Sequence, residues 1–120
     1  MTVTVITLLK RRDGMSKADF IAYYEERHRR IGEKVLAGYA TRYVRRFLFP
    51  MDGEDHICDA DVVMEIDFPD KARMEEFFAS AAQPDVAAMI SEDEARLFDR
   101  ARIRTFTVEE HFSRLPSAEE

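Results

Sequence analysis

The spacing of apolar residues changes along this chain in the order strand, helix, strand, strand, helix, strand, and this order restricts the fold more than any other feature. Alternating or β-branched segments typical of strands lie at 3–9, 39–49, 60–68 and 102–109. The segments after the first and third of these carry apolar residues three to four positions apart, which is typical of helices. We therefore expect two helical regions packed on one sheet of four strands.

Capping residues indicate where the helices begin and end. Ser16 and Asp19 resemble a capping box, and Gly38 stands where a helix end favours a residue that tolerates positive φ, so a first helix is predicted up to about residue 36 or 37. A second helix opens at Pro69–Asp70, and Pro84 starts a further helical stretch over 85–90. The segment 91–94 resembles another capping box and predicts a separate short turn.

The order β-α-β-β-α-β is the split βαβ, or ferredoxin-like, topology. The predicted fold class is therefore α+β, with a four-stranded antiparallel sheet. The 120 residues are ordinary length for one domain. We expect this domain to span 1–112 and a flexible polar tail to follow at 113–120.

Composition narrows the classes of partner and compartment. The chain is 46% hydrophobic and 35% charged, as globular proteins are, and its net charge of −6 opposes binding to nucleic acid. The single cysteine, Cys58, cannot form an internal disulfide. Residues 1–9 lack the basic start of a signal peptide, and no apolar run reaches the ~20 residues that span a bilayer. We expect a soluble cytoplasmic protein that binds neither nucleic acid nor membrane.

A second apolar face of the sheet predicts a homodimer. Two helices can cover only one face of four strands, yet the first strand is apolar on both faces. The segment 39–49 places four aromatic residues on one side, and we assign that side to the face that needs a cover: Tyr39, Tyr43, Phe47 and Phe49. An identical sheet from a second chain provides that cover, and the alternative is that long loops cover it within a monomer.

The first helix carries a histidine inside its apolar stripe. At about 100° per residue, one arc of roughly 100° contains Phe20, Ile21, Tyr24, His28, Ile31 and Val35. An imidazole there either finds a hydrogen-bond partner in the core or lines a pocket. Tyr24 precedes His28 by one turn, so the two side chains are neighbours.

The sequence from Lys10 to His28 resembles the opening of EthD-domain proteins: a basic loop with a glycine, then Ser, Phe, an aromatic pair and His. The segments 93–99 and 105–110 resemble the closing part of that family. The resemblance implies a dimeric α/β barrel made from two ferredoxin-like halves. It implies further that His28 is the family's helix histidine, Tyr24 its aromatic neighbour, and Asp61 a frequently acidic position. The resemblance also points to the activities of some members and wider relatives, which act on aromatic or polyketide-like molecules, while others accompany ether-degrading systems.

Other constellations are weaker. His28, His56 and His111 lack the spacing of metal ligands, and the chain has neither a Gly-rich phosphate loop nor a serine nucleophile elbow. Asp61, Glu65 and Asp67 share one strand face, where we expect Glu65 and Asp67 to pair with Arg45 or Arg104. We therefore expect no metal and no cofactor.

These observations lead to three functional hypotheses. In the first, a small enzyme without cofactor performs proton-transfer chemistry (cyclisation, dehydration, decarboxylation or isomerisation) on an apolar, oxygenated small molecule. Its catalytic residues are His28, Tyr24 and Asp61, with Asp61 orienting the imidazole, and its substrate-binding residues are Phe20, Ile31, Val35 and Phe98. The second is a non-catalytic binding or accessory protein for a small ligand. The third is a monooxygenase that works without a cofactor.

Overall fold

The structure, a computed structural model, describes residues 1–119 and contains four strands with helices between them. The strands are β1 (Val3–Leu9), β2 (Arg42–Phe47), β3 (Val62–Phe68) and β4 (Arg104–Thr107). The helical elements are α1 (Lys17–Tyr23), η1 (Tyr24–His28), α2 (Arg29–Leu36), α3 (Lys71–Ala81), α4 (Pro84–Leu97) and η2 (Arg100–Arg102). Among the described residues, every helix falls short of the length and apolarity that a bilayer crossing needs.

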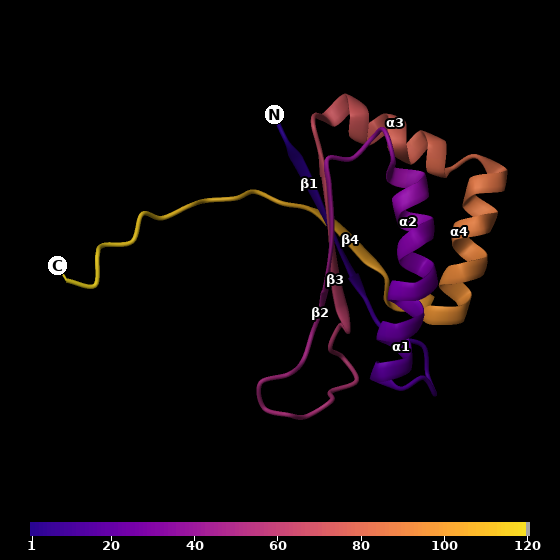
Figure 1. The fold of residues 1–120 in the computed structure, drawn as a ribbon, viewed down its shortest axis with the longest axis horizontal. Helices are drawn as coiled ribbons and strands as arrows, with labels where there is room; N and C mark the ends of the chain where they lie inside the picture. Colours follow the sequence, from indigo (N-terminus) through magenta and orange to yellow (C-terminus); the bar gives the residue numbers. More distant parts are fainter. Residues whose placement is uncertain (120) are drawn as a thin grey trace.

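The strands form one antiparallel sheet in the order β2-β3-β1-β4, and the helices cover one of its faces (Figure 1). This arrangement confirms the predicted α+β, ferredoxin-like fold. The elements α1, η1 and α2 follow one another without a break, so the first predicted helix is one rod whose middle turn is a π-helix.

The predicted helix ends agree with the structure except at one position. The Ser16 hydroxyl accepts a hydrogen bond from the Asp19 N–H at 3.1 Å, and Gly38 has a φ of 84° just beyond α2. Asp70 caps α3 in the same way. The predicted break at Ser91 is wrong: α4 runs through it from Pro84 to Leu97. A Ser-x-x-Glu pattern is also compatible with a helix interior, and the helix has already begun at Pro84.

The interior is divided into two apolar clusters. One lies toward α1 and contains Leu9, Phe20, Tyr24, Val62, Leu97 and Phe98. The other lies toward α3 and contains Val5, Leu36, Ile66, Phe68 and Phe77. Met64 packs against both clusters from the middle of β3. The core is therefore continuous along the sheet floor, while the space above its centre is left to the side chains described below.

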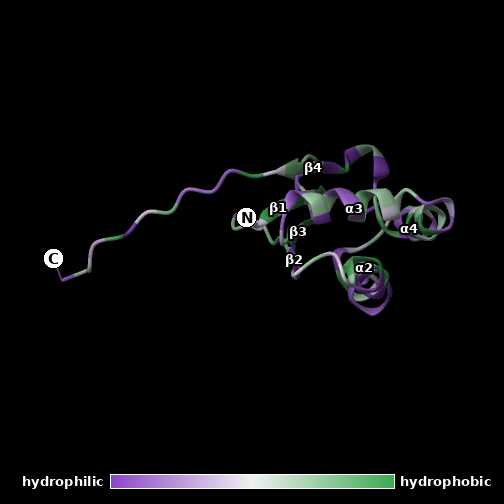
Figure 2. Ribbon diagram, turned by 90° about the horizontal axis from the view of Figure 1, so that it is seen from above, coloured by the Kyte–Doolittle hydropathy of each residue, from purple (hydrophilic) through white to green (hydrophobic). Residues whose placement is uncertain are grey.

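The aromatic face of β2 turns toward the helices, which corrects the sequence argument for the uncovered face. Tyr43 pairs with Ile66 and Phe47 with Val62, both on the helix-covered side. The opposite face instead carries half-buried or partly exposed apolar side chains near its centre: Ile6, Leu8, Val44, Val63 and Phe106. Figure 2 shows that face of the sheet without a helix. The error arose because strand alternation defines two faces without saying which one meets the helices.

The acidic residues of β3 lie on this uncovered face beside β2. Glu65 pairs with Arg46 at 2.6 Å and with Arg42 at 3.6 Å, whereas Arg45 points to the helix side and pairs with Glu25 at 2.7 Å. Arg42 also lies 3.9 Å from Asp67. The expected ion pairs across the sheet are thus present, with Arg42 and Arg46 in place of Arg45 and Arg104.

Candidate functional site

A cavity of about 370 Å³ lies between the sheet and the helices, bordered by both apolar clusters. The sheet contributes its floor, α2 one wall, and α3 with α4 the opposite wall. Its apolar lining residues include Val5, Leu9, Ile31, Val35, Leu36, Met64, Ile66, Phe77, Ile90, Phe98 and Ile103. Volume and lining both match the small-molecule sites of proteins, which are concave and mostly apolar with a few polar groups.

This cavity is partly open to solvent and is not a sealed void in the core. Its space can therefore be occupied by water or by a bound molecule.

His28 lines the cavity and is held from behind by Asp93. Its Nδ1 lies 2.8 Å from Oδ2 of Asp93, and both residues are buried. The hydroxyl of Tyr23 donates to the other Asp93 oxygen, Oδ1, at 2.5 Å. Burial, together with the hydrogen bond to Asp93, raises the pKa of Tyr23, so this phenol stays a donor at neutral pH.

This geometry leaves the second nitrogen of the imidazole for a bound molecule. Within residues 1–119, no hydrogen bond engages Nε2 of His28. When the Nδ1–H is donated to Asp93, Nε2 carries the lone pair that can accept a proton. The two alternatives for His28, a partnered core residue and a pocket residue, are therefore both realised.

The π-helical turn explains why only part of the predicted stripe reaches the cavity. The turn η1 begins at Tyr24 and ends at His28, and π-turns insert one extra residue into an α-helix. One residue corresponds to about 100° of rotation, so residues before and after the turn face different neighbours. Phe20 and Tyr24 face the α1 cluster, whereas His28, Ile31 and Val35 face the cavity.

Glu94 is a second ionisable group in the cavity wall. It follows Asp93 on α4, is half-buried, and within residues 1–119 has neither a hydrogen-bond partner nor an ion-pair partner for its carboxyl group. Burial raises the pKa of Glu94, while the nearby His28 and Arg100 act in the opposite direction. A carboxyl group in this setting can carry a proton closer to neutral pH than an exposed one.

Hydroxyl groups supply the remaining polarity of the site. Thr7 and Thr105 lie on the floor, with their Oγ1 atoms 3.2 Å apart, and Tyr43 lines the wall beside Gly32. Burial raises the pKa of Tyr43, so its hydroxyl stays protonated. These groups can orient an oxygen atom of a bound molecule without adding charge.

The predicted binding residues divide between the cavity and the core. Ile31, Val35 and Phe98 line the cavity. Phe20 and Tyr24 are completely buried in the α1 cluster, where the Tyr24 hydroxyl donates to Sδ of Met64 at 3.6 Å. Burial raises the pKa of Tyr24 well above its usual value, with a smaller contribution from Tyr43. The rings of Tyr24 and His28 pack edge to face with their centres 5.1 Å apart, so Tyr24 contacts the imidazole from the core side.

Asp61 lies in a different setting from the one predicted. The carboxylate that pairs with the imidazole is that of Asp93. Asp61 is 1% exposed, and its carboxylate accepts a hydrogen bond from the backbone N–H of Arg11 at 2.8 Å. The Nζ atoms of Lys10 and Lys17 lie 3.5 and 3.4 Å from its oxygens. Asp61 therefore joins the start of β3 to the basic loop after β1.

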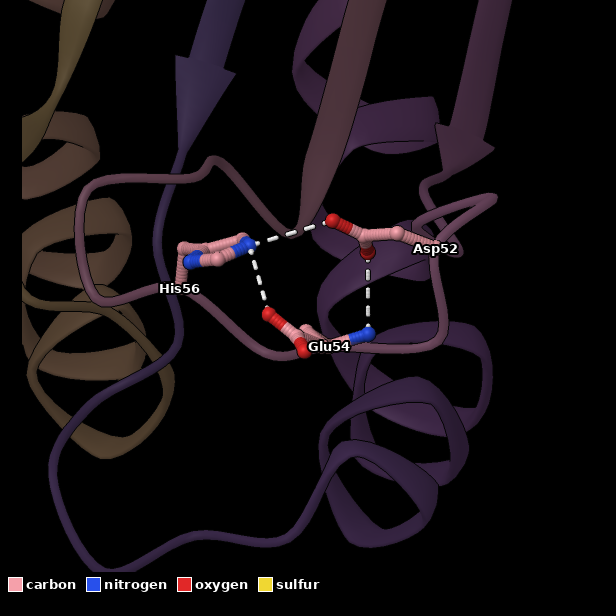
Figure 3. Close-up of side chains that lie close together, drawn as sticks. All are labelled: Asp52, Glu54 and His56. Atoms are coloured by element: carbon pink, nitrogen blue, oxygen red, sulfur yellow. Dashed lines mark hydrogen bonds and ion pairs between the residues drawn. The ribbon is translucent and has the colours of Figure 1, made fainter.

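The other histidines lie outside this site. His56 belongs to the loop between β2 and β3, where its Nε2 is 3.2 Å from Asp52 and 3.6 Å from Glu54 (Figure 3). All three of these side chains are exposed, and the two carboxylates lie within ion-pair distance of the imidazole. His111 pairs with Glu109 in the segment after β4. His28, His56 and His111 thus stand in a helix, a loop and a terminal segment.

Asp93 and Glu94 are the site residues that sequence reasoning missed. Both sit in the segment 93–99 that resembles the family's closing part, so that resemblance was the signal. Helix periodicity alone could not reveal them, because it does not show which side chain an acidic residue of α4 contacts. The partner of Asp93, His28, lies 65 residues earlier in the sequence.

Comparisons with known proteins agree with the fold. Residues 12–101 match the EthD domain profile, which is more than half of the chain. No curated protein matches this chain. A crystal structure of an ethyl tert-butyl ether D (EthD) family protein from Bacillus halodurans superposes with a TM-score of 0.65 at 15% identity, covering 92% of this chain and 100% of that one.

Two further solved structures are similar and are described as dimeric. A ferredoxin-like protein of unknown function from Thermobifida fusca has a TM-score of 0.61 at 13% identity, covering 90% of both chains. A protein of unknown function with a ferredoxin-like fold from Bacteroides fragilis has a TM-score of 0.54 at 16% identity, covering 92% of this chain and 96% of that one. At these identities the likeness concerns the fold.

Proposed function

Since this chain belongs to the EthD domain family, we propose that its central cavity is the active site of a small enzyme that transfers protons without a cofactor. The observation that carries this proposal is the His28–Asp93 pair, whose imidazole borders a mostly apolar cavity. A histidine oriented by a carboxylate is a common general acid/base, and such groups contribute about 10²–10⁴-fold to rates.

The lining suggests which part of a substrate meets which residues. Nε2 of His28 removes or returns a proton, and Glu94, whose pKa is raised by burial, serves as a second proton carrier. The hydroxyls of Thr7, Tyr43 and Thr105 hydrogen-bond a substrate oxygen. The apolar walls grip the carbon skeleton, with Ile31, Val35 and Phe98 as the predicted contacts.

These groups suit apolar, oxygenated substrates, including aromatic or polyketide-like ones. Cyclisation, dehydration, decarboxylation and isomerisation of such molecules all require protons to be moved beside a carbon–oxygen group. The net charge of −6 favours small molecules over nucleic acid as partners, and we propose a cytoplasmic location.

The test uses 5-nitrobenzisoxazole, an aromatic carbon acid small enough for the cavity. A base removes its C3 proton, the C–H electron pair forms the nitrile, and the N–O bond breaks to release a coloured phenolate. We expect His28→Ala to lower kcat/KM by about 10²-fold. His56→Ala, which alters an exposed histidine, is the matched control. Equal rates for His28→Ala and the unmodified protein would refute the role of His28.

The cavity itself also supports the second candidate, a non-catalytic protein that carries a small ligand. In that case the unmodified protein binds the probe but converts it no faster than free imidazole does. The monooxygenase hypothesis is separated by oxygen consumption with a hydroquinone, which the proton-transfer enzyme does not cause.

We also propose that the chain forms a homodimer through the uncovered face of the sheet. The central apolar side chains of that face, among them Ile6, Leu8 and Val63, have no helix above them (Figure 2). The dimeric relatives with the same fold support this arrangement. A two-fold partner of the same chain presents the same apolar side chains to this face.

A further inference from the structure

The segment after β4, residues 108–119, runs away from the rest of the chain. It contains neither helix nor strand, and Figures 1 and 2 both show it leaving the sheet on the side opposite the helices. The radius of gyration is 16.4 Å, whereas a compact chain of this length has about 14 Å. This segment, here called the C-terminal arm, therefore extends into the space beside the uncovered sheet face.

The arm carries large apolar side chains that no residue among 1–119 covers. Phe112 is 89% exposed and Leu115 is 81% exposed, and Val108 at the start of the arm is also exposed. A purely solvated tail favours polar and charged residues. Two large apolar side chains exposed on one short segment favour contact with another surface.

Phe106 is a further exposed apolar residue on this side of the molecule, where it faces outward from β4 beside Ile6. The loop between β2 and β3 also carries exposed apolar residues, but its Phe49 lies beneath the Lys17 ammonium group of α1, on the helix side. A second copy of the chain stacked on the uncovered face thus meets apolar groups from the sheet and from the arm.

We propose that the C-terminal arm is exchanged between two copies of the chain, with Phe112 and Leu115 packed on the partner. This inference rests on the proposed homodimer and adds to it the element that clasps the two subunits. The arm leaves the sheet of its own subunit and extends to the side from which a partner must approach (Figures 1 and 2). The flexible polar tail expected for 113–120, of which residue 120 lies outside the described residues, stays a prediction, and the exchanged arm is the alternative that we propose for 108–119.

Sedimentation equilibrium of the full chain and of three variants tests the proposal. We expect Phe112→Asp, Leu115→Asp and a chain ending at Thr107 each to weaken dimerisation at least tenfold. Ser113→Asp and Ser117→Asp, which add the same charge at polar positions of the arm, are the controls. A dimer of equal affinity in all variants refutes the exchanged arm and leaves the dimer intact. A monomeric full chain refutes both.

A fluorescence measurement separates exchange from folding back. The chain contains no tryptophan, so Phe112→Trp introduces a single reporter on the arm. We expect blue-shifted emission in the dimer and a red shift when dilution separates the subunits. A blue shift that does not change with dilution means that the arm packs on its own subunit, and emission at the solvent value throughout means that it packs on nothing. Either result overturns the exchange.

Discussion

At the scale of single residues, Asp93 connects three polar side chains behind the cavity wall. Its Oδ1 accepts a hydrogen bond from the Tyr23 hydroxyl, and its Oδ2 pairs with Nδ1 of His28. The Nη1 atom of Arg96 lies 3.9 Å from Oδ1. A buried carboxylate with these partners fixes the ring orientation of His28 and the direction in which Nε2 points. The residue that orients the imidazole therefore comes from α4, on the far side of the fold from β3.

We predict that Asp93→Asn destabilises the protein by about 1–3 kcal/mol. The amide has a single acceptor oxygen, so either Tyr23 or His28 faces an N–H₂ group instead of an acceptor. Urea unfolding measures the change. Glu92→Gln, which removes an exposed charge from the preceding position, serves as the control. An unchanged midpoint for Asp93→Asn contradicts the assigned hydrogen bonds.

We predict that Glu94→Gln changes how stability depends on pH. Burial raises the pKa of Glu94 in the folded protein, so the folded state binds its proton more tightly than the unfolded state does. The contribution of Glu94 to the stability of the unmodified protein should therefore fall as pH rises from the ordinary carboxyl pKa of about 4.3 through the raised value.

The measurement is the melting temperature of both proteins between acid and neutral pH. Glu94→Gln should gain stability relative to the unmodified protein as pH rises, and the difference should vanish in acid. A difference that stays constant with pH argues against a raised pKa for this group.

Among the elements, the long first helix is the one that shapes the site. Its π-turn moves His28, Ile31 and Val35 to the cavity while Phe20 and Tyr24 stay in the core. Beyond the turn, α2 approaches β2 closely at Gly32, where a Cβ atom would lie 2.6 Å from Oη and 2.8 Å from Cζ of Tyr43. The absence of a side chain at Gly32 lets the Tyr43 ring lie between helix and sheet.

We predict that Gly32→Ala destabilises the protein by about 1–3 kcal/mol, because the new methyl group overlaps the Tyr43 ring. Helix propensity alone predicts the opposite, a gain of about 1 kcal/mol. Chemical denaturation distinguishes the two, with Glu33→Ala as a control on the exposed side of the same helix. In a Tyr43→Ala background the penalty should disappear, and a penalty that persists there locates the clash elsewhere.

For the molecule as a whole, the two faces of the sheet have different tasks. The inner face, which the helices cover, carries the core and the cavity. The outer face, called the uncovered face above, carries an apolar centre with Arg42, Arg46 and Glu65 beside it. Helices cover the inner face only (Figure 1). The two proposals above place binding chemistry and assembly on opposite sides of one sheet, so we expect substitutions on one side to leave the other largely undisturbed.

We predict that the melting temperature rises with protein concentration, because unfolding of a dimer also separates its subunits. The expected rise is about 3–5 °C for each tenfold increase in concentration. Differential scanning calorimetry over a hundredfold concentration range checks it. Ile6→Glu, placed at the centre of the outer face, should remove the dependence, whereas Glu76→Lys on the exposed surface of α3 should not. A concentration-independent melting temperature indicates a monomer.

The amino-acid pattern alone was sufficient for the element order, the helix caps at Ser16 and Gly38, the family, and the placement of His28 on an apolar helix face. These properties depend on residues close together in sequence, where spacing and capping chemistry leave few alternatives. The pattern did not reveal the partner of His28, the orientation of β2 or the exclusion of Tyr24 from the cavity. Those depend on which surfaces meet across long sequence separations and on a π-turn that periodicity does not show, so they are set by packing in three dimensions.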